Sequence, residues 1–320
     1  MKYLTQTSTD PHFNMAFEQY CLEKSAFDEP FFYLWRNAPS VIIGLNQSAF
    51  TEVNLGYLKE NGIVLARRLT GGGAVYHDLQ NLNYSFVLPR GSLCNPVGMI
   101  AAALRSMGVP ADISGRNDIL VDGRKCSGYA KRLWKDRVLI HGTLMFNVDI
   151  QALINVLSAQ GSKLSSKGVD SVRSRVANLK DFLPSGTTID SFKAGLEDIL
   201  SGRDGKIMLE EASWAEINDL ADKRFRREEW IYGRSPLSGI VREKHFNCGN
   251  IRADISVSHG IIKDIRFTGD FIGDKEVSGL ERSLIACSFS EDALYDIVSQ
   301  LIGEYFDGVS ASEFVSFLLG

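Results

Sequence analysis

The stretch Arg67-Arg68-Leu69-Thr70-Gly71-Gly72-Gly73-Ala74-Val75-Tyr76-His77-Asp78 sets two cations, a hydroxyl, three glycines and a His-Asp pair between two apolar segments. The flanking segments, residues 63–66 and 82–88, are predicted strands because they are short β-branched or aromatic runs bounded by turn residues. Consecutive glycines are costly to order unless the backbone must approach something closely or take positive φ. Backbone N–H groups and guanidinium forks bind anions. This glycine loop, residues 70–74, is therefore predicted to hold a phosphate or carboxylate.

Two common glycine motifs are excluded at this loop. A P-loop needs Gly-Lys-Ser/Thr, whereas Gly73 is followed by Ala74 and Val75. A dinucleotide fingerprint opens a helix, whereas this loop continues into a strand-like run. The remaining structural alternative is that the glycines only relieve a tight hairpin.

A second informative stretch follows at residues 115–130. Asp122-Gly123 is a hairpin-turn signal that places Asp118 and Lys125 on neighbouring strands. The small residues after Lys125 leave room for a ligand beside its side chain, although a strand lysine is more often solvated than functional. The next strand-like run, residues 138–147, contains His141 beside Gly142, and that glycine permits a close backbone approach.

Together these motifs resemble the lipoate–protein ligase A family, whose catalytic fold is similar to that of biotin–protein ligases. The resemblance covers nearly the whole chain, including a C-terminal segment from about Phe246. Its motifs are Phe31 to Gly44 with Trp35-Arg36-Asn37, Arg67 to Asp78 continuing to Asn81, Gly115-Arg116-Asn117-Asp118, Arg124-Lys125 with Ser127-Gly128, His141-Gly142-Thr143-Leu144, and Ser171-Val172-Arg173-Ser174-Arg175-Val176 with Asn178.

The predicted fold class is α+β. Strands outnumber what a doubly wound parallel pattern allows, and short turns join several of them, so a mixed, largely antiparallel sheet with flanking helices is expected. The resemblance adds a biotin/lipoyl protein ligase-like catalytic domain at residues 1–238 and a small α+β accessory domain at 246–320. Turn residues at 233–239 mark the linker between them.

Local signals also predict individual elements of both domains. Asp10-Pro11 is an N-cap followed by proline, and it opens a helix that contains Phe13 and Tyr20. Further helices are expected at residues 100–107, 149–157, 189–200, 213–226 and from 292 onward. A hairpin is expected at Ser258-His259-Gly260.

The activity implied by the resemblance is ATP-dependent ligation. Lipoate and ATP would give lipoyl-adenylate and pyrophosphate, with Mg²⁺ as the metal. The lipoyl group would then pass to a lysine of an acceptor, namely the lipoyl domains of 2-oxoacid dehydrogenase E2 subunits and the H protein of glycine cleavage.

The resemblance also implies roles for individual residues. Lys125 would be the catalytic cation at the reacting carboxylate and α-phosphate, since a compact ammonium can follow developing charge. Asp118 would lie near the adenylate and Mg²⁺, because a single carboxylate suits a metal that keeps its waters. The other residues expected to bind lipoate or the adenylate are Trp35, Arg68, Thr70, Gly71, Gly72, Gly73, Val75, His77, Asn81, Ser127, Ala130 and His141.

Two other functions are weighed against this one. The first is octanoyl or lipoyl transfer from a preformed donor without ATP, for which Cys126 would be a nucleophile, although no local motif activates its thiol. The second is a catalytically silent binding module. Lys125, Asp118 and the glycine loop argue against the silent module, and the accessory domain argues against the transferase.

Composition excludes several other classes of function. The 320 residues carry a net charge of only −4, so no basic footprint for nucleic acid is expected. No apolar run is long enough to span a bilayer or to act as a secretory signal. The five scattered cysteines fit a reducing, cytoplasmic location without disulfides. Basic clusters at 131–137 and 223–227 are interpreted as solvated faces, the first of which could instead dock an acidic acceptor domain.

Overall fold

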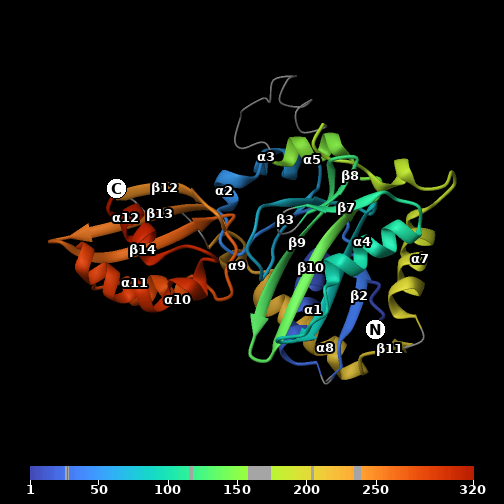
Figure 1. Cartoon of the computed structure of the whole chain (residues 1–320), viewed down its shortest axis with the longest axis horizontal. Coiled ribbons are helices and arrows are strands. Elements are labelled where there is room, and N and C mark those ends of the chain that lie inside the picture. The colour runs from blue at the N-terminus through green and yellow to red at the C-terminus, as the bar shows by residue number, and fades with distance from the viewer. Residues whose placement is uncertain (26, 28, 115–117, 158–173, 203–204, 234–238) are drawn as a thin grey trace.

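The computed structural model describes residues 1–320 except 26, 28, 115–117, 158–173, 203–204 and 234–238. Part of the 115–118 motif, residues 171–173 and most of the predicted linker therefore lie outside the described residues. Figure 1 shows a larger N-terminal lobe and a smaller C-terminal lobe beside it.

The larger lobe is built on an eight-stranded sheet. Its strand order is β11-β1-β2-β6-β10-β9-β8-β7. β1 runs parallel to both of its neighbours, and every other pair in the sheet is antiparallel. The strands are β1 (Lys2–Leu4), β2 (Phe31–Trp35), β6 (Asn81–Pro89), β7 (Ala111–Ser114), β8 (Asp118–Val121), β9 (Arg124–Trp134), β10 (Arg137–Met145) and β11 (Lys206–Ile207). The prediction of a mixed, largely antiparallel sheet is confirmed.

Both faces of this sheet are covered, which explains the unbroken apolar sequence of β2. Phe32 and Leu34 pack in one core with helices α4 and α7. Phe31, Tyr33 and Trp35, which alternate with them, pack in another core with α1 and α8. The helices of this lobe are α1 (Pro11–Glu23), α2 (Ala49–Glu52), α3 (Leu55–Glu60), α4 (Pro96–Ser106), α5 (Ile150–Leu157), α7 (Ile189–Ser201), α8 (Glu211–Leu220) and α9 (Glu228–Tyr232), with shorter turns η1 (Leu179–Phe182) and η2 (Ala221–Phe225).

Helix starts follow the capping signals. Asp10 Oδ1 accepts hydrogen bonds from the amides of His12 and Phe13 at the start of α1, as predicted. α4 begins at Pro96, earlier than the expected residue 100, because Asn95 caps it through the Gly98 amide. The helix expected at 213–226 is interrupted, since α8 ends at Leu220 and continues as the π-helical turn η2.

A small second sheet carries the glycine loop. β3 (Ser40–Ile43) lies between β4 (Val64–Arg67), to which it is parallel, and β5 (Val75–His77), to which it is antiparallel. The loop therefore joins two strands that are not paired, separated by the width of the strand between them, about 10 Å. The alternative that the glycines serve a tight hairpin is wrong.

The C-terminal lobe has its own sheet and core. β12 (Ile240–Phe246), β13 (Gly249–Ser258) and β14 (Ile261–Gly269) form an antiparallel sheet packed on α10 (Ser278–Leu284), α11 (Glu291–Tyr305) and α12 (Ala311–Leu319). The predicted hairpin turn is present, with His259 and Gly260 at φ 52° and 73°. β12 begins before residue 246, so this sheet includes residues ahead of the expected accessory domain.

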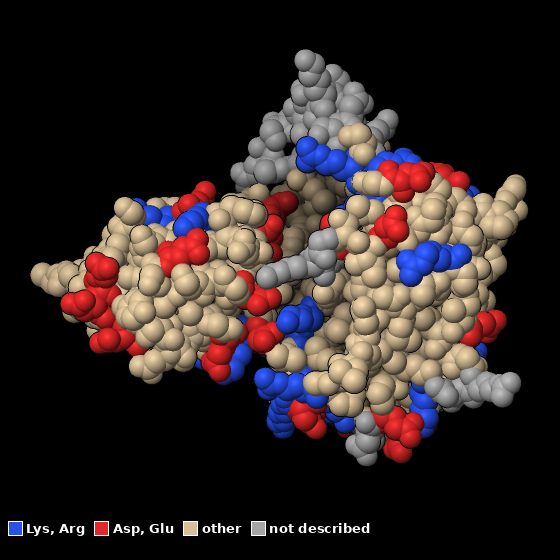
Figure 2. Space-filling model, viewed as in Figure 1, with Lys and Arg blue, Asp and Glu red and all other residues tan. Residues whose placement is uncertain are grey.

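The two lobes meet along β9, at the segment that follows β3, and at the glycine loop, where the Gly72 amide donates to the Phe271 carbonyl. The Gly269 amide donates to the Asn46 carbonyl at 3.1 Å. Arg132 Nη2 lies 2.9 Å from Glu276, and Lys131 Nζ lies 3.4 Å from Asp274. Figure 2 shows acidic and basic side chains meeting where the smaller lobe approaches the larger one. The first basic cluster is therefore partly neutralised by the C-terminal lobe and is not simply a solvated face.

Candidate functional site

A cavity of about 210 Å³ lies between the glycine loop, α1 and the strands β9 and β10. Ile272 of the C-terminal lobe also borders it. Nine of the residues predicted from the sequence line it, namely Trp35, Arg68, Gly72, Gly73, Val75, His77, Lys125, Ala130 and His141. Residues distant in sequence thus converge on one pocket with an apolar wall and a few polar groups, which is typical of a small-molecule site.

Lys125 and Asp118 form an ion pair at the mouth of the cavity. Lys125 Nζ lies 2.7 Å from Asp118 Oδ1, and both side chains are partly exposed. The predicted hairpin is present, with Asp122 and Gly123 at positive φ between β8 and β9. A Cβ on Gly128 would lie 3.0 Å from Lys125 Nζ, so this glycine makes room for the ammonium group.

The two adjacent arginines have different roles. Arg67 is 1% exposed, and its guanidinium donates to backbone carbonyls of Gly44, Leu45, Gln47, Trp230 and Ile231. The prediction that both arginines present cationic forks to an anion is therefore wrong for Arg67, which ties β4 to neighbouring segments.

Arg68 braces the glycine loop from inside. Its Nη2 donates to the carbonyls of Gly71 and Gly73 at 2.7 and 2.8 Å, and its Nη1 donates to Ile42 at 3.0 Å. Burial lowers the pKa of this guanidinium to about 10, which leaves it charged at neutral pH. Arg68 therefore fixes the loop conformation and adds a buried positive charge to the cavity wall.

A buried polar network underlies the cavity. Both oxygens of the Glu18 carboxylate lie 2.8 Å from His141 Nδ1, and His141 Nε2 lies 2.7 Å from Thr70 Oγ1. Ser85 Oγ donates to Glu18 at 2.6 Å and accepts from the Trp35 indole at 2.9 Å. His141 links Glu18 of α1 to Thr70 of the glycine loop, and hydrogen-bonded partners are what make a buried polar network stabilising. Thr70 thus positions the glycine loop and does not line the cavity.

His77 is also buried, at 3% exposed. Burial, the charge of Arg68 and the nearby His141 lower its pKa to about 3, so its imidazole is neutral at neutral pH. Its Nδ1 lies 3.1 Å from Asn37 Nδ2, and its Nε2 has no partner among the described residues.

The remaining predicted residues lie around the cavity without lining it. Gly71 faces the C-terminal lobe, where a Cβ would meet the Phe271 carbonyl at 2.2 Å. Asn81 donates to Asn83, which does line the cavity. Ser127 is buried on β9 opposite Ile119. Asp118 reaches the cavity only through its pairing with Lys125.

Cys126 is fully buried, and its thiol donates to the Ile119 carbonyl at 3.3 Å. Burial raises the pKa of this thiol to about 12, so almost no thiolate exists at neutral pH. Cys126 therefore packs in the core and is not an acyl-transfer nucleophile.

The sequence did not predict Glu18 and Asn37, which contact His141 and His77, or Met15 and Ile42, which line the cavity. A carboxylate within the apolar run of α1 was the available signal for Glu18, because a buried acid needs a partner. Asn37 belonged to a quoted motif but had no assigned role, and its contact with His77 joins residues 40 positions apart.

The described residues contain no group of three or more His, Cys, Asp or Glu side chains that could hold a metal ion. A lone carboxylate such as Asp118 still fits Mg²⁺, which binds one or two protein carboxylates together with substrate phosphates and water. Nor is any helix in the described parts long and apolar enough to cross a membrane.

Comparisons with known proteins agree with this geometry. The family model of the lipoyl protein ligase A/B catalytic domain matches residues 10–201, and that of the bacterial lipoate protein ligase C-terminus matches residues 235–318. A lipoate-protein ligase of Bacillus subtilis, LplJ, is 37% identical over 98% of both chains.

Two solved structures are also similar. Plasmodium falciparum LipL1, in complex with lipoate, has a TM-score of 0.85 and 26% identity over 99% of both chains. Lipoate-protein ligase A bound with ATP has a TM-score of 0.62 and 30% identity, covering 73% of this chain and 99% of that one.

Proposed function

The chain belongs to the lipoate–protein ligase family, and we propose that it activates lipoate with ATP and transfers the lipoyl group to a lysine of an acceptor domain. The observation that carries this proposal is the position of Lys125 Nζ at the mouth of the cavity, 2.7 Å from Asp118. The similar proteins with lipoate and with ATP support the choice of substrates. The buried Cys126 argues against the form of the ATP-independent alternative in which this thiol is the nucleophile.

The reaction has two steps. A lipoate carboxylate oxygen attacks the α-phosphorus of ATP, and pyrophosphate leaves with the electrons of the broken P–O bond. The acceptor lysine, as the free amine, then attacks the carbonyl carbon of lipoyl-adenylate, and AMP leaves as an amide forms. A proton is released from the attacking amine.

Lys125 is proposed to serve both steps. Its ammonium would contact the carboxylate and the α-phosphate together, so that their mutual repulsion falls as they approach. Asp118 holds the ammonium in place and would supply a ligand for Mg²⁺, which neutralises phosphate charge when bound.

The apolar wall of the cavity is proposed to hold the lipoyl chain. Met15, Trp35 and Ile42 line it together with Val75, and the first three are buried. The lipoate carboxylate would then point toward Lys125 and the glycine loop, where the cations lie.

The proposed acceptors are lipoyl domains of 2-oxoacid dehydrogenase E2 subunits and the H protein of glycine cleavage. We propose that the reaction takes place in the cytoplasm, where the five free cysteines would stay reduced.

The test is to incubate the pure protein with ATP, Mg²⁺, lipoate and an apo lipoyl domain, and to weigh the domain by mass spectrometry. The expected result is a mass gain of one lipoyl group that needs ATP and every other component. A second incubation replaces ATP and lipoate with a preformed acyl donor. A mass gain in this second incubation only would support the transferase, and no gain in either incubation would support the silent binding module.

A further inference from the structure

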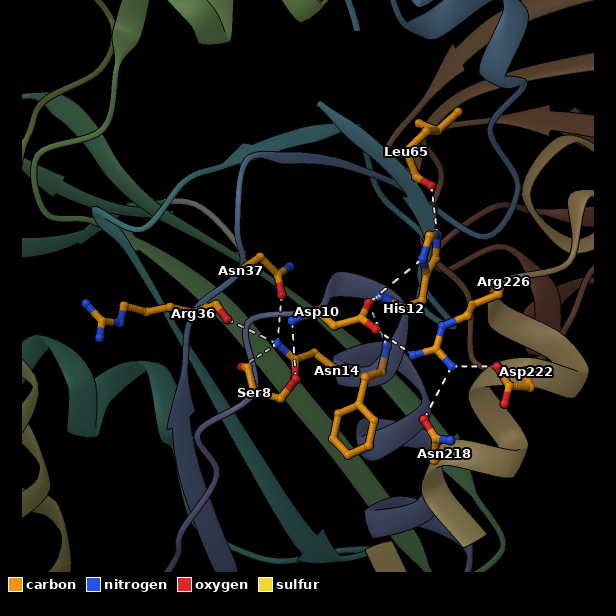
Figure 3. Close-up of polar contacts among 11 residues, drawn as sticks. Ser8, Asp10, His12, Asn14, Arg36, Asn37, Leu65, Asn218, Asp222 and Arg226 are labelled. Carbon is orange, nitrogen blue, oxygen red and sulfur yellow. Dashed lines mark hydrogen bonds and ion pairs between the residues drawn. The ribbon is translucent and has the colours of Figure 1, made fainter. Parts of the chain in front are cut away.

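A chain of buried amides leads from Asn14 on α1 through Asn37 to His77. Asn14 lies on α1 and is 1% exposed. Its Nδ2 lies 3.1 Å from the carbonyl oxygens of Ser8 and Arg36 and 2.8 Å from Asn37 Oδ1, so its two hydrogens are shared among three acceptors. Figure 3 shows these three acceptors around the Asn14 amide.

This environment fixes which way each amide points. If Asn14 were reversed, its Oδ1 would face the backbone carbonyl oxygens of Ser8 and Arg36 with no hydrogen between them. The amide of Gln6 moreover donates to Asn14 Oδ1 from the other side. The hydrogen-bond network is the proper basis for assigning amide orientation, and here it allows only one.

The orientation of Asn14 determines that of Asn37. Asn37 is fully buried, and its Oδ1 must accept from Asn14. Its Nδ2 therefore faces His77 Nδ1, 3.1 Å away. Because an amide NH₂ only donates, His77 Nδ1 must accept, and the single ring hydrogen of the neutral imidazole must sit on Nε2.

His77 Nε2 is buried and has no hydrogen-bond partner among the described residues, although His77 lines the cavity. An unsatisfied buried N–H costs free energy, so a ligand that accepts it gains affinity. Burial, the charge of Arg68 and the neighbouring His141 all disfavour a second proton on His77.

We propose that Asn37, held by Asn14, is a positioning residue that keeps His77 as the neutral Nε2–H tautomer, so that this N–H donates to an anionic oxygen of the substrates in the cavity. The inference rests on the proposed function for the identity of that oxygen, a carboxylate or phosphate oxygen. The tautomer itself does not depend on the reaction. A neutral donor stabilises charge without changing its own protonation state as the pH varies.

The tautomer is measured directly in the free protein. Two-bond ¹H–¹⁵N correlation spectra of protein labelled with ¹⁵N-histidine distinguish the two neutral tautomers and the protonated ring. The His77 signals are assigned by their absence from the His77→Gln protein. The expected result at neutral pH is the Nε2–H form. An Nδ1–H form or a doubly protonated ring in the wild-type protein would by itself overturn the proposal.

The functional arm uses Asn37→Asp. The new carboxylate still accepts from Asn14, but it also accepts from His77 Nδ1–H, so the neutral ring loses its Nε2 hydrogen. Only the protonated ring then keeps the donor. Lipoate-dependent pyrophosphate release, as a ratio to wild type, should fall with rising pH between about pH 6 and 8, with a loss of roughly 10²-fold at the upper end.

A matched control is Asn250→Asp in the C-terminal lobe. Asn250 also pairs with a histidine, His245, at 2.9 Å, but this pair is exposed and does not line the cavity. The pyrophosphate release of Asn250→Asp, divided by that of wild type, should stay near one at every pH. If the Asn37→Asp ratio were equally flat, Asn37 would have only a structural role. If wild type released no pyrophosphate while His77 showed the Nε2–H form, the proposed function would fail and the tautomer assignment would stand.

Discussion

The Gly72 amide donates a hydrogen bond to the Phe271 carbonyl at 3.2 Å, so the glycine loop and the C-terminal lobe are joined backbone to backbone. Next to it, Gly71 leaves no room for a side chain beneath the same carbonyl. The conformation of the loop that lines the cavity is therefore coupled to the position of the smaller lobe.

Gly71→Ala tests whether the contact between the glycine loop and the C-terminal lobe matters for activity. Its Cβ would meet the Phe271 carbonyl at 2.2 Å, a backbone atom that cannot turn aside, so the lobe contact must shift. Pyrophosphate release should fall roughly 10-fold or more, because small displacements of groups that position substrate are costly. Gly303→Ala on α11, where no atom lies within 4 Å of the new Cβ, is the matched control. Equal activities of the two variants would contradict the coupling.

Lys125→Ala is expected to reduce adenylation by roughly 10²–10³ while the protein stays folded, because it removes the charge proposed to face the reacting carboxylate and α-phosphate. Lys125→Arg should restore little, since a planar fork cannot replace a point charge. Pyrophosphate release is measured beside Lys263→Ala, which removes an exposed strand lysine from the C-terminal lobe. Activity of Lys125→Ala within a few-fold of this control would exclude the assigned role.

A chain that ends after Ser238 is expected to remain folded, because the larger lobe has its own cores on both faces of its sheet. It would lose the contacts of Gly72 and Arg132 with the C-terminal lobe. Adenylation should fall strongly, since lipoate and ATP with its Mg²⁺ must be held in line with water excluded. Transfer from supplied lipoyl-adenylate to an apo lipoyl domain should persist.

The two half-reactions of the truncated chain are compared by pyrophosphate release and by the mass of the acceptor. Equal loss of both in a folded protein would mean that the smaller lobe also builds the transfer site. Equal retention of both would remove any role for it in closing the cavity.

Asp10 is expected to make stability depend on pH. Burial raises the pKa of this carboxylate, but hydrogen bonds from Arg226 and the Phe13 amide outweigh burial and lower it (Figure 3). A group with a lowered folded-state pKa stabilises above its unfolded pKa, about 3.9, and loses that stabilisation as the pH falls through the folded value. Asp10→Asn should therefore cost about 0.5–1 kcal/mol at pH ~7, a small value because the pair is partly exposed.

Urea unfolding of wild type and Asp10→Asn measures this difference. It should shrink steadily below about pH 4 as wild-type Asp10 gains its proton. Asp112→Asn, at an exposed position on β7, should have the same unfolding free energy as wild type both near neutral pH and in acid. A constant difference between wild type and Asp10→Asn across the range would show that capping geometry alone matters.

Local sequence determined much of this protein. The Asp10-Pro11 cap, the Asp122-Gly123 turn and the short apolar runs act within a few residues, so they predict helix starts, a hairpin and most strands without tertiary information. That hairpin brings Asp118 and Lys125 onto neighbouring strands. The turn alone does not fix their ion pair, because the register places Lys125 opposite Leu120 and Asp118 opposite Gly128, with an irregularity between Ile119 and Leu120.

Tertiary structure decided the rest, because the contacts involved join distant parts of the chain. Arg67 and Arg68 are adjacent and chemically identical, yet one holds the fold and the other braces the glycine loop, since Arg67 ends β4 and Arg68 begins the segment that follows it, in different surroundings. Glu18 meets His141 across 123 positions, and Asn37 meets His77 across 40. No periodicity or spacing encodes such pairs, because they arise only when a helix, a loop and strands of two sheets pack around one cavity.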